Sequence, residues 1–186
     1  MQAGKSEFQV LREQNSREVR LAGAEVAGKV FVDKHPLHSL KLPAIGRLCP
    51  KAKFLFVHRD PRDVVLSCFG RHFIMNPATY QVLLTLEGAS AFYDVTMRLT
   101  DTAQFLLGLH WQAIRHEDLV TVLDRQLCSV CSFLGLEWVP GPDSFADQAQ
   151  ARLRNRPDIR HWRHYRTMLK PILPTLDPWV KRLEWG

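Results

Sequence analysis

The chain has 186 residues and is 46% hydrophobic, which is typical of a globular protein with a core. The length suits one domain over residues 1–186, and no internal boundary is visible. A net charge of +6 and a pI near 9.4 favour anionic partners without choosing among nucleotides, acidic peptides, nucleic acid and anionic lipid. No apolar run approaches the roughly 20 residues of a membrane span, and no hydrophobic signal core begins the chain. We therefore expect a cytoplasmic protein.

The first third of the chain contains an expected helix, strand and second helix. Residues 5–20 carry a weak helical pattern among many charges, which predicts a mostly exposed helix. The β-branched and aromatic run at residues 29–32 predicts a buried strand that ends at Asp33 and Lys34. Residues 37–50 have apolar side chains near helical spacing, and Pro43 predicts a bend in that helix.

The middle of the chain contains the clearest strand-to-helix junction. Residues 54–57 form an unbroken apolar run, typical of a parallel strand buried on both faces. Asp60 can act as N-cap of the next helix, Pro61 needs no N–H there, and Asp63 places a carboxylate at the positive end of the helix dipole. The sequence therefore predicts a strand that ends near Arg59 and a helix that continues to residue 73.

Further strand and helix patterns alternate after residue 88. Residues 88–107 have an apolar stripe at helical spacing and predict a core-facing helix capped by Ser90. Residues 109–114 predict a third buried strand, and residues 118–134 an amphipathic helix that ends at Gly135. This alternation predicts an α/β fold with a parallel sheet, right-handed crossovers and helices on both faces.

Three polar side chains follow the central strand and can converge. Arg59 lies at the strand end, and Ser67 and Arg71, four residues apart, share one face of the next helix. Two arginines and a hydroxyl beside a helix N-terminus suit a phosphate, because open α/β sheets bind ligands at the ends of their strands. The alternative is that these side chains are ordinary solvated residues.

The segment RDPRDVVLS, at residues 59–67, resembles the 3′-phosphate-binding segment of sulfotransferases that use 3′-phosphoadenosine 5′-phosphosulfate (PAPS). The neighbouring VDKHPLHSLKLPAIGRLCP is also similar to this family, particularly to bacterial members with tetratricopeptide repeats and more distantly to tyrosylprotein sulfotransferases. The resemblance implies a sheet like that of P-loop nucleotide-binding proteins. It also implies that Arg59 and Ser67 hold the 3′-phosphate of PAPS, and that His116, where the family has a tyrosine, lies near the adenine.

The resemblance also implies a catalytic role for Lys34. A lysine ammonium can stabilise charge on the bridging oxygen during sulfuryl transfer to a hydroxyl of a protein, carbohydrate or small molecule, although a lysine at a strand end is commonly just solvent-exposed. The family's N-terminal 5′-phosphosulfate loop and its acidic base have no counterpart here, so we expect the C-terminal portion of a family domain. His35 and Glu117 are the candidate replacement bases. We accordingly expect binding of PAPS without efficient transfer.

Other functions are less well supported by the sequence. A non-catalytic module that binds a nucleotide or another anion is the main alternative to an enzyme. The basic residues are scattered and form no nucleic-acid-binding motif, so nucleic acid is not an expected partner. His161 with His164, and Cys128 with Cys131, lack the further ligands of a metal site, and we expect no metal.

Overall fold

The computed structural model describes residues 7–21, 30–70, 81–139 and 159–185. The chain divides into two compact units. Unit 1 comprises residues 1–52 and 97–110, and unit 2 comprises residues 53–96 and 111–186. The sheet, apart from His110 at its edge, and the predicted phosphate-binding residues that are described belong to unit 2.

Unit 1 is helical in its described part. It contains α1 (Glu7–Leu21), α2 (His38–Leu48) and the second half of α5 (Leu86–Leu107), a helix that continues from unit 2. The predicted helices at residues 5–20 and 37–50 are confirmed, and α2 continues through Pro43. None of the described helices is both long and apolar enough to cross a membrane.

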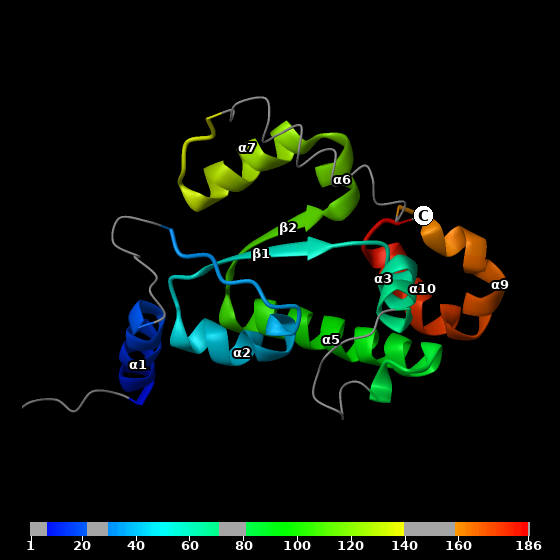
Figure 1. Cartoon of the computed structure of the whole chain (residues 1–186), viewed down its shortest axis with the longest axis horizontal. Coiled ribbons are helices and arrows are strands. Elements are labelled where there is room, and N and C mark those ends of the chain that lie inside the picture. The colour runs from blue at the N-terminus through cyan, green and yellow to red at the C-terminus, as the bar shows by residue number, and fades with distance from the viewer. Residues whose placement is uncertain (1–6, 22–29, 71–80, 140–158, 186) are drawn as a thin grey trace, which may run out of the picture. The chain divides into compact units, whose positions relative to one another are not determined.

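The sheet of unit 2 pairs β1 (Lys53–His58) with β2 (His110–Arg115), and the two strands point the same way (Figure 1). The next helices along the chain from β2 are α6 (His116–Thr121) and α7 (Leu123–Leu134). Lys53 donates a hydrogen bond to the Phe133 carbonyl and Gln112 donates one to the Ser129 hydroxyl, each at 2.8 Å, which attaches α7 to both strands. The predicted α/β fold with a parallel sheet and flanking helices is therefore confirmed.

Helix α3 (Pro61–Phe69) follows β1 after two residues, as its capping signals predicted. Asp60 is the N-cap and accepts a hydrogen bond from the Arg62 backbone N–H at 3.0 Å. Proline at the first helical position costs no hydrogen bond, because that N–H would have no partner within the helix. The helix ends at Phe69, before Gly70, and the predicted continuation over residues 71–73 lies outside the described residues.

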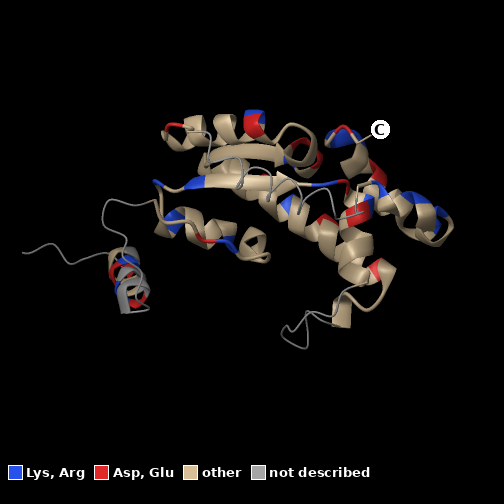
Figure 2. Cartoon of the chain, turned by 45° about the horizontal axis from the view of Figure 1, so that its top comes forward, with Lys and Arg blue, Asp and Glu red and all other residues tan. Residues whose placement is uncertain are grey.

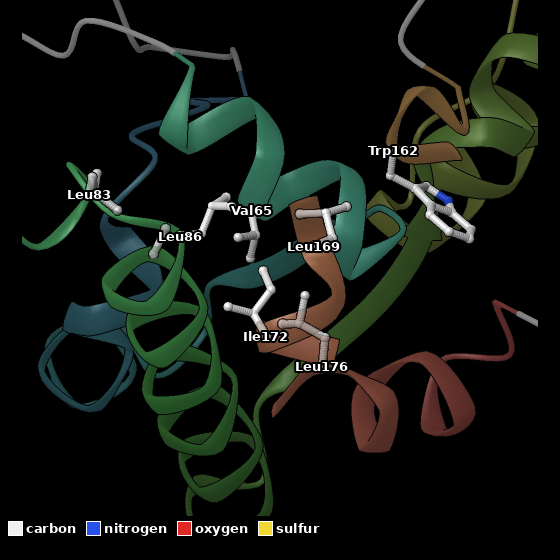
Figure 3. Close-up of a cluster of buried hydrophobic side chains, with 8 residues drawn as sticks. Val65, Leu83, Leu86, Trp162, Leu169, Ile172 and Leu176 are labelled. Carbon is white, nitrogen blue, oxygen red and sulfur yellow. The ribbon is translucent and has the colours of Figure 1, made fainter. Parts of the chain in front are cut away.

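The core of unit 2 forms where α3 meets the C-terminal segment. That segment comprises the 3₁₀ helix η1 (His161–Tyr165), α9 (Arg166–Leu169), η2 (Lys170–Ile172) and α10 (Leu173–Arg182). Figure 3 shows the buried side chains that meet there. They are Val65 of α3, Leu83 just before α5, Leu86 and Ala89 of α5, and Trp162, Leu169, Ile172 and Leu176 of the C-terminal segment. This packing fixes η1 and α9 beside α3.

Four of the predictions about strands and helices were wrong in detail. Residues 30–32 form no strand and their side chains are 53–74% exposed, because no strand pairs with this run in the part of the chain that is described. Burial alternates along β1, so this strand is not buried on both faces. Val122, with φ −137° and ψ 52°, separates α6 from α7, where one helix was expected. The Ser90 hydroxyl donates to the Glu87 carbonyl inside α5 and does not cap that helix.

Candidate functional site

A cavity of about 400 Å³ opens beside α3 in unit 2. One wall comes from the end of β1 and from α3, and the other comes from η1 and α9. The lining residues are Arg59, Asp63, Leu66, Ser67, Phe69, Gly70, His161, Tyr165 and Met168. The two residues that the sequence analysis assigned to a 3′-phosphate, Arg59 and Ser67, thus lie in one cavity. Its volume is in the range of small-molecule sites.

Arg59 follows β1 directly, and only 16% of its side chain is exposed. Its guanidinium lies 3.5 Å from the carboxylate of Asp63, one helical turn further along the chain. This separation exceeds the 2.7–2.9 Å typical of a strong charge-assisted hydrogen bond. Asp63 therefore holds Arg59 near the cavity by charge and does not form a close bidentate pair with it.

Asp63 is buried, and its two oxygens accept backbone hydrogen bonds from η1 and the residue before it. Oδ2 accepts from the Arg160 N–H and Oδ1 from the Trp162 N–H, each at 2.8 Å. Burial raises the pKa of Asp63, while the Trp162 N–H, the Arg59 charge and the Arg160 N–H act in the opposite direction. The carboxylate thus connects the first turn of α3 to a segment almost 100 residues later.

The second wall presents His161 and Tyr165, which the sequence analysis did not assign to this site. Their rings lie 5.2 Å apart between centroids. An imidazole and a phenol can each donate a hydrogen bond to an anion. Apolar side chains recur at helical spacing within residues 159–169, and that spacing does not reveal a contact with α3.

A second group of polar side chains lies where β2 ends. Arg115 donates to the Glu184 carbonyl at 3.0 Å, and its guanidinium carbon lies 4.1 Å from the Trp185 ring centroid. Neither carboxylate oxygen of Glu117 forms a hydrogen bond of ordinary geometry with a described residue, but the N–H groups of Glu117 itself and of Asp60 lie near enough to act on the carboxylate. Burial raises the pKa of Glu117, although the N–H groups of Glu117 and Asp60 and the charge of Arg59 lower it. Glu117, a candidate base, thus lies within electrostatic range of Arg59.

The remaining predicted site residues have different locations. His116 is the first residue of α6 and is half-buried. Lys34 belongs to unit 1, in an exposed stretch without regular structure, and His35 beside it accepts a hydrogen bond from the Leu37 N–H. Arg71 lies outside the described residues. No group of three or more potential metal ligands gathers anywhere in the described ranges.

Comparisons with known proteins identify the family. Residues 2–140 match the model of the sulfotransferase family. The omega-hydroxy-beta-dihydromenaquinone-9 sulfotransferases Stf3 of Mycobacterium bovis and Mycobacterium tuberculosis are each 26% identical to this chain over 117 residues. The match covers 58% of this chain and 29% of the length of each relative. No solved structure shows significant similarity. Because the family match covers most of its residues, this chain belongs to the sulfotransferase family.

Proposed function

We propose that the chain binds PAPS and its product 3′-phosphoadenosine 5′-phosphate (PAP), with the 3′-phosphate in the cavity beside α3. The observation that carries this proposal is that Arg59 and Ser67 line one cavity of about 400 Å³ at the end of a parallel strand. A guanidinium and a hydroxyl are the groups that proteins use to hold phosphate oxygens. The donor set therefore fits a phosphate.

Two further contacts with the nucleotide are part of the proposal. Arg71 would add a second positive charge, because it lies four residues after Ser67 in the sequence. His116 would contact the adenine, since an imidazole can stack on a base or form a hydrogen bond with it. Support for both residues comes from the sequence resemblance.

The reaction that we propose is transfer of a sulfuryl group to a hydroxyl of a protein, carbohydrate or small molecule. The acceptor oxygen forms a bond to sulfur, the bond from sulfur to the bridging oxygen breaks, and the hydroxyl proton passes to a base. Bound PAPS supplies the sulfuryl group. We propose Lys34 for stabilising the negative charge on the bridging oxygen, and Glu117 or His35 for accepting the proton.

Glu117 has one property that a base needs. Its pKa is raised by burial, and a base works best when its pKa lies near the working pH.

The four cysteines of the chain are free, which supports the proposal of a reducing, cytoplasmic location.

Calorimetry with PAP and with adenosine 5′-phosphate tests the binding proposal. We expect the wild-type chain to bind PAP more tightly, because only PAP carries a 3′-phosphate. Ser67→Ala should weaken PAP binding on the order of tenfold, since a hydrogen bond to a charged group is lost. Ser132→Ala, which removes an exposed hydroxyl on α7, is the matched control. Equal affinity for the two nucleotides would refute the proposal.

The second candidate function is a binding module without catalysis, which would need Arg59 and Ser67 in the cavity but would need no catalytic role for Lys34, an exposed residue outside regular structure. A transfer assay with radiolabelled PAPS and phenolic, carbohydrate and peptide acceptors distinguishes the two functions. We expect binding of PAPS with little turnover. Lys34→Ala should leave affinity nearly unchanged and abolish the remaining transfer, because its interaction develops only in the transition state. Robust turnover would contradict the expectation of weak activity.

A further inference from the structure

The second wall of the cavity lies outside the part of the chain that matches the family model. That match ends at residue 140, whereas His161, Tyr165 and Met168 follow it by at least 20 residues. Family membership therefore assigns no role to this wall. Its function has to be argued from the contacts that hold it beside α3.

The wall is held by a backbone turn around the Asp63 carboxylate. Arg160 has φ 59° and ψ 25°, a left-handed conformation that is unfavourable for a residue with a Cβ. Left-handed and right-handed residues in succession turn their N–H groups into a concave anion-binding site. Here the anion is Asp63, which accepts from the N–H groups of Arg160 and Trp162 at 2.8 Å. The turn that carries His161 thus depends on a carboxylate from α3.

A second contact attaches the same turn to the start of α3. The guanidinium carbon of Arg62 lies 3.8 Å from the ring centroid of Trp162, which is only 7% exposed. Arg62 is itself fixed by two hydrogen bonds to the carboxylate of Asp60, at 2.7 and 2.8 Å. Because the residues on both sides of His161, Arg160 and Trp162, are held by α3 or its N-terminus, the second wall has little freedom to turn away from α3.

Asp63 also contacts the first wall. Its Oδ2 atom accepts from the Arg160 N–H and lies 3.5 Å from the Arg59 guanidinium. One carboxylate therefore contacts both the arginine on the first wall and the turn that carries His161 and Tyr165. The residues on the two walls are separated by about 100 positions in the chain but share this single buried side chain.

We propose that His161 and Tyr165 bind the phosphate from the second wall of the cavity and that Asp63 is the positioning residue that places this wall. The inference rests on the proposed function, since the phosphate is the 3′-phosphate of PAP. Arg59 holds the anion from the end of β1 and Ser67 from α3, and the imidazole and phenol donate hydrogen bonds to it from η1. Asp63 itself contacts no ligand, and its like charge would repel one.

Two substitutions test the ligand contacts. His161→Ala and Tyr165→Phe should each weaken PAP binding on the order of fivefold, the effect of one lost hydrogen bond, and leave binding of adenosine 5′-phosphate unchanged. His164→Ala is the control for a general effect of changing η1, because His164 is an exposed histidine of the same 3₁₀ helix that does not line the cavity and whose ring lies 5.7 Å from that of His161. This control should bind PAP as tightly as wild type.

A double-mutant cycle tests the positioning role of Asp63. Asp63→Asn keeps the side-chain shape but places an amide NH₂ against a backbone N–H, so the turn should move away from α3. In this background His161→Ala should have no further effect on PAP affinity. If Asp63 serves only overall stability, the fivefold effect of His161→Ala should persist whenever circular dichroism shows the variant to be folded, and the positioning role is overturned. If Asp63→Asn does not fold, the His161 and Tyr165 variants still decide whether the second wall binds phosphate.

The outcomes separate this inference from the proposed function. If PAP is preferred over adenosine 5′-phosphate, and Arg59→Ala removes that preference while His161→Ala and Tyr165→Phe leave it intact, the proposed function stands and the inference fails. If the wild-type chain shows no preference for PAP, both fail. A loss with His164→Ala as large as with His161→Ala would also overturn the inference, because it would show a general effect of changing η1.

Discussion

The two strand-to-helix junctions of unit 2 differ in how their acidic side chains are satisfied. After β1, Asp60 caps α3 and Asp63 accepts two backbone hydrogen bonds. After β2, no side chain caps α6, and the buried oxygens of Glu117 form no hydrogen bond of ordinary geometry among the described residues, although the N–H groups of Glu117 and Asp60 lie near them. Both carboxylates lie in the first turn of a helix, and burial raises the pKa of each.

This difference indicates that the carboxylate of Asp63, and not that of Glu117, has a structural role. A buried polar group with partners stabilises the fold, whereas one without partners costs about 1–3 kcal/mol. Asp63 is therefore committed to holding η1, and Glu117 contributes no comparable contact in the described structure. Glu117 is for this reason the better candidate for proton transfer.

Removing Asp63 should have the largest effect on stability. Asp63→Ala leaves the N–H groups of Arg160 and Trp162 without this acceptor and removes one charge partner of Arg59. We expect the free energy of unfolding to fall by about 3–5 kcal/mol, measured by urea denaturation with circular dichroism. Asp124→Ala, which removes an exposed carboxylate from the first turn of α7, should change it by less than about 1 kcal/mol. Similar decreases in unfolding free energy in the two variants would show that the contacts of Asp63 stabilise the fold no more than an exposed helix carboxylate does.

Replacing the arginine at the β1 to α3 junction, Arg62, should destabilise the fold more than replacing the arginine at the β2 to α6 junction, Arg115. Arg62 makes a bidentate pair with Asp60, donates to the Trp185 carbonyl and stacks on Trp162, whereas Arg115 donates to one carbonyl and stacks on Trp185. We expect Arg62→Ala to lower the free energy of unfolding by about 2 kcal/mol and Arg115→Ala by about 1 kcal/mol. The reverse order in the same denaturation experiment would break the comparison.

Glu117→Gln should be neutral or stabilising at pH 7, by up to about 1 kcal/mol. Burial raises the pKa of Glu117 above its ordinary 4.5, so folding favours the protonated acid, and the stability that this group contributes is lost as pH rises through the raised pKa. Glutamine does not ionise and should remove that loss. The difference in unfolding free energy between wild type and variant, measured at pH 4 and pH 7, should therefore grow with pH. A difference that shrinks with pH would show that the charged form is stabilised.

His58 should produce a smaller effect of opposite sign. Burial and the charge of Arg115 lower the pKa of His58 below its ordinary 6.5, while Asp118 raises it. Folding therefore favours the neutral imidazole, and its contribution is present above pH 6.5 and lost as pH falls through the lowered pKa. His58→Gln should flatten the pH dependence of the unfolding free energy below pH 6.5. If the unfolding free energy of the variant falls with pH as steeply as that of the wild type, His58 is not the source of this pH dependence.

The β1 to α3 junction was predictable from the sequence because its signals are local. Asp60 and Pro61 specify the helix start through the backbone groups next to them, and the apolar run before them specifies a strand. The spacing from Arg59, before the helix, to Ser67, inside it, then lets both side chains face the same cavity. These interactions span fewer than ten residues, so the sequence order alone reveals them.

Other features depend on partners that sequence spacing does not reveal. Residues 30–32 have strong strand propensity, but a strand also needs a neighbouring strand, and these side chains are exposed. The roles of His161 and Tyr165 depend on hydrogen bonds between Asp63 and the backbone almost 100 residues later. Those donors are main-chain N–H groups, which every residue except proline carries, so side-chain identity gave no signal.

The central claim is that Arg59 binds the 3′-phosphate, and the most direct test measures the effect of Arg59→Ala on two ligands that differ only in that group. By calorimetry, the variant should bind PAP about 10- to 150-fold more weakly than wild type, the equivalent of one charge-assisted contact, and should bind adenosine 5′-phosphate with unchanged affinity. Arg125→Ala, which removes an exposed arginine of α7, should bind both ligands as wild type does. An equal loss for both ligands in Arg59→Ala, or no loss for PAP, would contradict the account.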